Sequence, residues 1–306
     1  MSVEQELPQL PRFSLLIPAI LWKGNQAPQG KEDLPATRYR VNNIDIDAER
    51  LRAFNELLDW PDATLVHPCF LHTLAFPLQI KLMLQKAFPF SVMGVVHIAN
   101  SFEQYQPVDR HSRVDICCYL GAIKRLKIGW LFSLHSEFYV AGKLVLKAKH
   151  QYLRRASQGK IATAPATPDV LDLTRYQSQQ WQLPVSLGWQ YANCSDDYNP
   201  IHLHPLSARL LGFKQNIAHG MWTKGRAFSA LVAQIPALLH SPLRCEVEFK
   251  KPLYLPNTVT FYHRDSDVLA SNGEGLSFGV LGEHQQQSTL HMSGSLSLLV
   301  PEQRSN

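Results

Sequence analysis

Residues 191–222 read YANCSDDYNPIHLHPLSARLLGFKQNIAHGMW, and no other stretch of the chain is as dense in chemically special residues. Asp197, Asn199 and His202 lie close together in it. Pro200 stands between them and disfavours helix at the residue before it, so the three side chains are expected on a stiff turn. A carboxylate and an imidazole presented together can hold and transfer protons, which makes Asp197 and His202 candidate acid–base residues.

A purely structural interpretation of the same turn stays open. Asp and Asn before Pro are ordinary turn formers, and Asp197 could bond only neighbouring backbone amides. His204 and His219 could also be structural histidines, and we favour that interpretation for His204. The spacing of His202 and His204 could instead place both on one strand face as a metal pair. Because no Cys, Glu or third His nearby in the sequence completes such a set, we expect no metal.

The second feature is His219-Gly220, which opens an apolar pattern with helical spacing that Pro236 ends. The first N–H groups of a helix have no partner inside it and lie at the positive end of its dipole, so they can bind an oxyanion. Glycine at this point allows a carbonyl to approach the backbone closely. The alternative is that Gly220 is only a helix cap.

Outward from this helix, alternating or β-forming segments predict strands. In the second half they cover residues 244–251, 259–263, 276–283 and 290–300, with a turn at Asn272-Gly273. In the first half a similar helix is predicted over residues 70–84, which Pro77 must either begin or break. It is followed by strand patterns at residues 92–105, 114–120, 130–140 and 143–153.

Between the halves, residues 156–184 are rich in Ala, Thr, Gln, Ser and Pro, which predicts a linker. Each half then shows the same order: a polar loop, a helix opening at a His, and several strands. This is a repeat at domain scale. A long apolar helix needs cover on every face, and a curved antiparallel sheet wrapped around it would supply that cover. Periodicity alone also allows a generic α+β sandwich.

Length and composition narrow the class of protein. The chain has 306 residues, about twice a usual single domain of ~150. Its net charge of +5 is spread out, without the basic block typical of a nucleic-acid arm, although it could attract an acidic ligand. The five cysteines form no CxxC pair, which favours a reducing, cytoplasmic compartment. The apolar run at residues 13–22 is too short to span a bilayer and follows acidic residues, so we expect neither signal peptide nor membrane anchor.

The string SDDYNPIH, followed by IAHGM, resembles the signature of MaoC-like (R)-specific enoyl thioester hydratases and 3-hydroxyacyl thioester dehydratases. The resemblance implies an α+β double hot-dog fold, with two curved antiparallel sheets each wrapped around a central helix. It implies that Asp197 and His202 form the catalytic dyad, that Asn199 supports it, and that the Gly220 N–H forms the oxyanion hole. Asp196 departs from the pattern, because many members have Gly there.

The resemblance is specific over residues 187–300 and only architectural before them. In the first half His67-Pro68 replaces His-Gly, and no D-x-N-P-x-H string occurs. We therefore expect a degenerate, non-catalytic hot-dog unit at residues 1–155 and a catalytic unit at residues 185–306. The degenerate unit would complete the sheet and make room for the acyl chain.

The function implied is a hydro-lyase that interconverts (3R)-hydroxyacyl and trans-2-enoyl thioesters of coenzyme A or acyl carrier protein, without a cofactor. Nucleic acid and membrane are not expected as partners, and the chain could be a monomer with an internal pseudo-dimer or a homodimer. Two alternatives stay open: an acyl thioesterase of the same fold, and a non-catalytic acyl-binding partner subunit.

Overall fold

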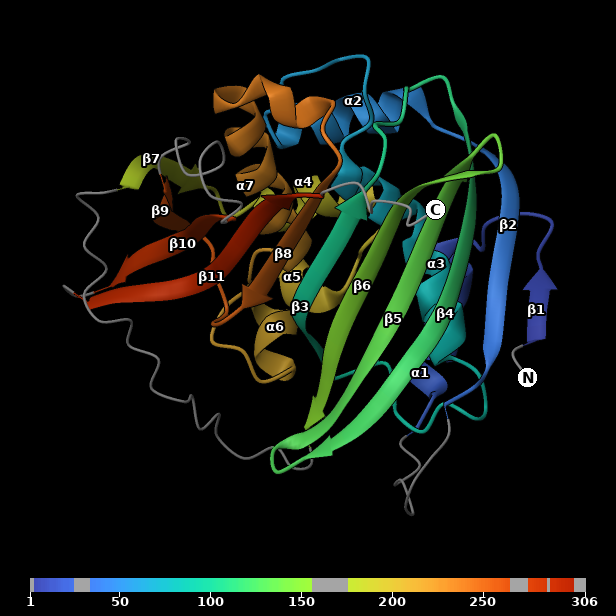
Figure 1. Ribbon diagram of the computed structural model, residues 1–306. Coiled ribbons are helices and arrows are strands. Elements are labelled where there is room, and N and C mark those ends of the chain that lie inside the picture. The colour runs from blue at the N-terminus through green and yellow to red at the C-terminus, as the bar shows by residue number, and fades with distance from the viewer. Residues whose placement is uncertain (1–2, 25–33, 156–175, 265–274, 285–286, 300–306) are drawn as a thin grey trace.

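The computed structural model describes residues 3–24, 34–155, 176–264, 275–284 and 287–299 (Figure 1). Its helices are α1 (Phe13–Trp22), α2 (Ala48–Leu57), α3 (Pro68–Met83), α4 (Leu187–Ser195), α5 (Pro200–Leu203), α6 (Pro205–Leu210), α7 (Gly220–Gln234) and a 3₁₀ helix (Pro236–Leu239). Its strands are β1 (Val3–Glu6), β2 (Thr37–Asp45), β3 (Val95–Gln104), β4 (Arg113–Leu126), β5 (Gly129–Val140), β6 (Lys143–Arg155), β7 (Tyr176–Leu183), β8 (Leu243–Phe249), β9 (Asn257–Arg264), β10 (Leu276–His284) and β11 (Gln287–Leu298).

All these strands join one sheet in the order β1-β2-β4-β5-β6-β3-β8-β11-β10-β9-β7. Apart from the parallel pair β1–β2, every pairing is antiparallel. The order β2-β4-β5-β6-β3 of the first half is mirrored by β7-β9-β10-β11-β8 of the second. The two halves meet where β3 pairs with β8, from Ala99 opposite Glu248 to Gln104 opposite Leu243. The repeat predicted from sequence is therefore a repeat of sheet topology.

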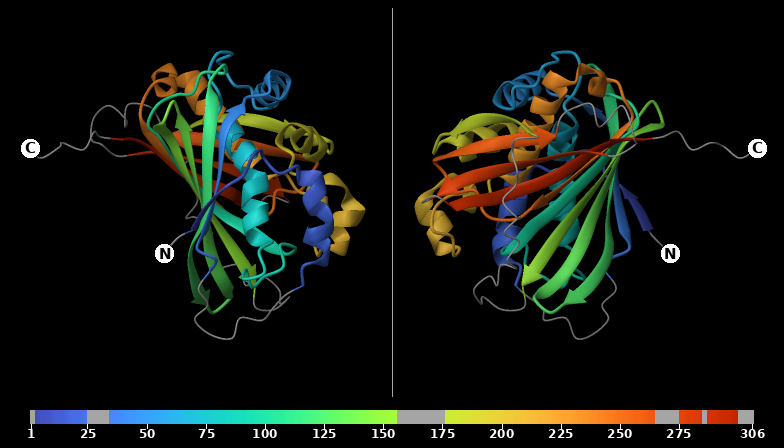
Figure 2. Two further views of the ribbon diagram at one scale, coloured as in Figure 1. Left: turned by 90° about the vertical axis from the view of Figure 1, so that its right-hand side faces the viewer. Right: turned by 60° about the vertical axis from the view of Figure 1, so that its left-hand side comes forward.

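The sheet curves around α3 and α7, which lie on its concave side (Figures 1 and 2). Helix α3 is buried over nearly its whole length, and α7 is buried over most of its length. A helix that is apolar on all sides is stable only where packing covers every face. The wrapped-helix fold predicted from the sequence is confirmed.

Both central helices and all eight predicted strands are present, with ends shifted by a few residues. The expectation that Pro77 must begin or break its helix is wrong, because α3 runs through Pro77 from Pro68 to Met83. A helical proline costs about 3 kcal/mol through a lost hydrogen bond and a steric clash. Here Pro77 is fully enclosed among core side chains, and tertiary packing rather than local propensity sustains a buried helix.

The predicted linker at residues 156–184 is too long. Tyr176–Leu183 form the edge strand β7, which pairs with β9, and residues 156–175 lie outside the described part of the chain. The polar Gln-rich composition that indicated a linker is also acceptable on an edge strand with one solvated face. The predicted turn Asn272-Gly273 and the end of the last strand at Val300 also lie outside the described residues. Among the described residues, no helix has both the length and the apolar character needed to cross a membrane.

One turn of α7 joins the halves. Gly225 lies so close to the first half that a β-carbon there would overlap the Leu58 side chain. Arg226 forms an ion pair with Asp59. Lys224 is fully buried and donates to the backbone carbonyl of Asn100 on β3 at 3.4 Å. Three consecutive residues of the second half thus contact the first half directly.

We predict that a fragment comprising residues 174–306 aggregates or self-dimerises when expressed alone. Removing the first half would expose the β8 edge and the apolar surface beneath it, and both promote association. Size-exclusion chromatography with light scattering would measure the outcome against the full-length chain. A monomeric, soluble fragment with a cooperative thermal transition would show that the second half does not depend on the first.

Candidate active site

The loop that carries Asp197 begins where α4 ends, at Asp196. Asp196 has a left-handed backbone with φ of 61°, a conformation that glycine adopts freely and Asp tolerates. Arg50 of α2 holds this turn: its guanidinium forms an ion pair with the Asp196 carboxylate at 3.1 Å and donates from Nε to the Cys194 carbonyl at 2.7 Å. The departure from Gly at residue 196 is therefore compatible with the turn, and a side chain of the first half helps to hold it.

Asp197 follows with its carboxylate partly enclosed, the side chain being 26% exposed. Its Oδ1 accepts a hydrogen bond from the Asn199 backbone N–H at 3.3 Å. Burial raises the pKa of this carboxyl, while the neighbouring His202 and the Asn199 N–H oppose the shift. The Asn199 side chain accepts the Ile201 N–H at 3.4 Å and caps α5. Asn199 thus connects the carboxylate to the short helix that carries His202.

His202 lies on α5 and is 8% exposed. Its Nδ1 is 2.8 Å from the carbonyl oxygen of Ile217, which can only accept, so Nδ1 carries the proton. Burial lowers the pKa of His202 to about 3, and the nearby His219 contributes to this shift. The imidazole is therefore neutral near pH 7, and its Nε2 keeps a lone pair.

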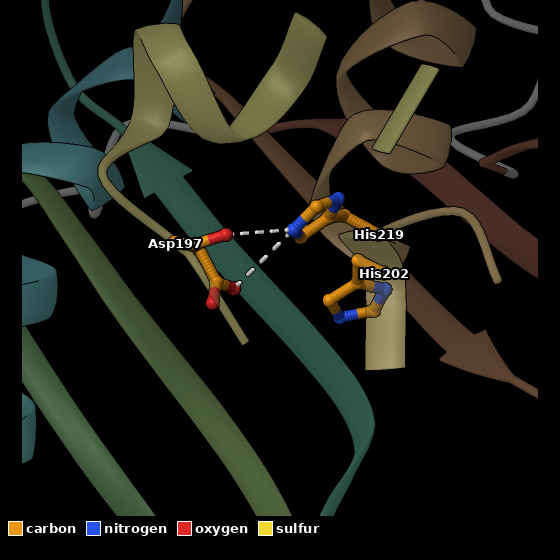
Figure 3. Close-up of side chains that lie close together, drawn as sticks. All are labelled: Asp197, His202 and His219. Carbon is orange, nitrogen blue, oxygen red and sulfur yellow. Dashed lines mark hydrogen bonds and ion pairs between the residues drawn. The ribbon is translucent and has the colours of Figure 1, made fainter. Parts of the chain in front are cut away.

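His219 completes the cluster, as Figure 3 shows. Its Nε2 donates to the backbone carbonyl of Asp197 at 3.0 Å and lies 3.9 Å from the Asp197 carboxylate. Its ring stacks on His202 with centroids 3.6 Å apart, and Tyr191 lies on it at 4.8 Å. His219 therefore fixes the Asp197 backbone against the His202 ring. The sequence showed His219 only as a helix opener, because its contact with Asp197 spans 22 residues.

The same three side chains form a group that could bind a metal ion, although the sequence led us to expect none. Asp197, His202 and His219 each offer a ligand atom, and these atoms lie within 4.8 Å of one another. This set differs from the His202–His204 pair considered in the sequence, because His204 caps α6 and the fold brings in His219 instead. His202 Nδ1 and His219 Nε2 already donate to backbone carbonyls, which leaves one ring nitrogen of each imidazole as a possible ligand. These residues could hold a metal ion, so the absence of a metal stays a prediction.

Comparison with known proteins finds a family match in the second half of the chain. Residues 170–274 match the family model described as MaoC like domain. The chain is 25% identical over 236 residues to 3-hydroxyacyl-thioester dehydratase X of Mycobacterium tuberculosis, covering 77% of this chain and 83% of that protein. Residues 170–274 therefore resemble the MaoC like domain family.

Solved structures agree with the fold of this chain. The crystal structure of HtdX of Mycobacterium tuberculosis superposes with a TM-score of 0.70 and 23% identity, covering 86% of this chain and 100% of that one. A Mycobacterium tuberculosis protein described as having a double hotdog fold superposes with a TM-score of 0.58 and 12% identity, covering 94% of this chain and 98% of that one. The double hot-dog fold expected from the sequence is therefore confirmed.

Gly220 is the first residue of α7, with its N–H at the helix start. The preceding loop is held by the Ala218 N–H, which donates to the Leu253 carbonyl at 2.8 Å. A β-carbon on Gly220 would lie 2.9 Å from the Phe249 ring, which is closer than packing allows. Glycine therefore has a packing reason here, beside the oxyanion role that the resemblance implies.

Two other histidines have structural contacts. His204 caps α6, its Nδ1 accepting the Leu206 N–H at 3.1 Å, which agrees with the structural interpretation. His67 precedes α3 as His219 precedes α7. Its Nδ1 accepts the Cys69 N–H at 2.9 Å and its Nε2 donates to the Gly225 carbonyl at 3.1 Å. Since the backbone occupies both nitrogens of His67, it has no free atom for proton transfer.

Buried imidazoles predict an acid-sensitive fold. Burial lowers the pKa to about 3 for His67, His72, His97, His202 and His219, and lowers that of His150 well below its usual value. Unfolding would restore pKa values of about 6.5. Each group's contribution to stability is therefore fully present above about pH 6.5 and is lost as the pH falls from there towards the folded-state value, at about 1.4 kcal/mol per pH unit.

We expect the melting temperature to fall steeply as the pH drops below about 6.5. The variant His72→Phe removes one of these imidazoles and should flatten the dependence. Differential scanning calorimetry across the range would measure both. A melting temperature that stays constant down to about pH 5 would show that these histidines are not held neutral.

Proposed function

We propose that this protein is a hydro-lyase that interconverts (3R)-hydroxyacyl and trans-2-enoyl thioesters of coenzyme A or acyl carrier protein, with Asp197 and His202 as its acid–base pair. One observation carries the proposal: the half-buried Asp197 carboxylate lies within 4.8 Å of the neutral His202 imidazole, whose Nε2 keeps a lone pair. The two groups have shifted pKa values because burial disfavours the charged form of each. The relative named a 3-hydroxyacyl-thioester dehydratase supports the reaction class.

In the dehydration direction, the thioester carbonyl would accept the Gly220 N–H at the start of α7. This contact would stabilise the enolate-like charge that forms as the C2 proton leaves, and a donor of this kind is worth about 3 kcal/mol or more. His202 Nε2 would take that proton, since its other nitrogen donates to Ile217. Asp197, with its raised pKa, would protonate the departing hydroxyl, and in hydration it would take a proton from the attacking water.

His219 and Asn199 would act as positioning residues for this pair. His219 holds the Asp197 backbone through Nε2, and the Asn199 N–H binds the carboxylate. In the described part of the first hot-dog unit, His67 holds the position that matches His219, and both of its nitrogens bond the backbone. We therefore propose that residues 1–155 are the non-catalytic unit and that catalysis belongs to residues 185–306. Metal analysis of the purified protein would test the further proposal that the pair works without a metal.

The central mutational prediction is that Asp197→Asn and His202→Ala each reduce hydration of a trans-2-enoyl thioester by about 100- to 10,000-fold. Asn keeps the size of Asp and can still accept the Asn199 N–H, but it cannot exchange a proton. Loss of enoyl absorbance measures the reaction, and a thiol reagent detects any thioesterase activity. Because both residues act as a unit in one reaction, the double variant should lose little more than either single variant.

His204→Ala is the matched control, since it removes an imidazole two residues away that caps α6. It should keep most of the activity. Circular dichroism and thermal melting must first show that each variant is folded. A folded Asp197→Asn protein that retains more than about a tenth of wild-type activity would overturn the acid–base assignment.

A further inference from the structure

Beyond the site just described, a buried chain of polar contacts runs from Lys224 of α7 into the first half. The Lys224 ammonium is fully buried, and among the described residues no carboxylate lies within ion-pair distance of it. It donates to the backbone carbonyls of Asn100 and Cys245, the latter at 3.2 Å, and to the Asn100 side-chain oxygen. Three acceptors match the three protons of an ammonium.

The contact with Lys224 fixes the orientation of the Asn100 amide. An ammonium can only donate, so the Asn100 atom beside it is the oxygen and the other atom is the NH₂ group. That NH₂ group donates to His150 Nδ1 at 3.0 Å. His150 Nδ1 is therefore an acceptor, and the proton of this neutral ring sits on Nε2.

His150 Nε2–H ends the chain without a partner. His150 is fully buried, and no hydrogen-bond acceptor for Nε2 lies among the described residues. His72 of α3 stacks on His150 with centroids 4.4 Å apart, is itself 9% exposed, and has an equally unpartnered Nδ1. Buried polar atoms without partners are costly, and His150 and His72 line one cavity, which favours a polar group as its occupant.

Both imidazoles line a small cavity, with room for about one water-sized group. Asn100 lines it too, and the remaining wall is largely apolar, including Phe102, Phe138 and Leu146. The cavity also touches Pro68 and Met221, the first residue of α3 and the second of α7. Met221 directly follows Gly220, so the cavity lies near the start of α7. The flexible Met221 side chain can yield to a chain passing between the helices.

The charge of this cavity selects the ligand. Lys224, whose pKa burial lowers, donates to Asn100 and so polarises that amide and through it the His150 Nε2–H. A positive field and a free donor favour an electron-rich oxygen over a cation or an alkyl end. The small volume favours a single oxygen over a carboxylate.

We propose that this cavity binds an uncharged oxygen, a hydroxyl or keto group, carried on the distal part of the acyl chain. This assignment adds a substrate preference to the proposed function and rests on it. The protein would then prefer oxygenated acyl thioesters to plain alkyl ones, with His150 donating to the oxygen and His72 providing a second contact.

The test measures binding of saturated acyl-CoA thioesters, which cannot be hydrated, by isothermal titration calorimetry. Pairs of equal chain length end in a methyl or a hydroxyl group, over a series of increasing lengths. At the length that reaches the cavity, the wild-type protein should bind the hydroxyl member roughly 2- to 10-fold more tightly, which is the range for one hydrogen bond. His150→Phe should remove this preference, so that the two members bind equally.

His72→Phe is the second variant, because His72 Nδ1 has no hydrogen-bond partner among the described residues that the change would remove. This variant should also lower the ratio of hydroxyl to methyl binding. The matched control is His135→Phe on β5. The preceding residue, the buried Leu134, pairs with His150. Because successive side chains of a strand alternate between faces, His135 points to the opposite face of the sheet. This control should keep the wild-type ratio. Equal binding of methyl and hydroxyl members at every length would overturn the inference, as would tighter binding of a carboxylate-ended member.

The two proposals fail separately. If the protein hydrates trans-2-enoyl thioesters but shows no preference at the chain end, the cavity assignment falls and the hydro-lyase stands. If it hydrates none, yet binds the hydroxyl members more tightly and loses this with His150→Phe, the hydro-lyase falls and the cavity assignment stands.

Discussion

The antiparallel pairing of β3 with β8 is the interaction on which the rest of the structure depends. It makes two five-stranded repeats into one sheet and sets the distance between α3 and α7, which are packed against that sheet. Lys224, Gly225 and Arg226 then fit α7 to the first half by a buried cation, a close contact and an ion pair. Arg50 reaches back from α2 to the turn before Asp197. The proposed catalytic loop is therefore held by both halves, although its acid–base residues all come from the second.

The proposed chemistry depends on burial together with fixed backbone acceptors. In a poorly solvated site the neutral forms of Asp197 and His202 are favoured, and a carbonyl at 2.8 Å decides which nitrogen of His202 is protonated. The same rule gives His150 its free N–H, where the fixed partner is the Asn100 amide. His67 shows the opposite case, because the backbone occupies both of its nitrogens. One residue type thus serves three roles according to which backbone or amide groups surround it.

The sequence predicted the two central helices, eight strands and the repeat because these have strong apolar periodicity. It did not predict β1, β2, α2 or β7, since short or edge elements with polar faces resemble loops. At the site, Asp197, Asn199, His202 and Gly220 come from one continuous stretch, and the structure brings their elements together. His219 and Arg50 could not be assigned their contacts from sequence, because these join distant segments. The pocket of His72 and His150 depends on α3, β3 and β6 meeting, which only the fold provides.

The most direct measurement of the central claim is the fate of solvent hydrogen when a trans-2-enoyl thioester is incubated with the protein in deuterium oxide. If water adds across the double bond with a solvent-exchanged proton delivered to C2, mass spectrometry and NMR will show an intact 3-hydroxyacyl thioester carrying deuterium at C2 and a single (3R) centre. Recovery of free thiol together with a free enoic acid that carries no deuterium at C2 would contradict the account. That result would place the chemistry at the thioester carbonyl.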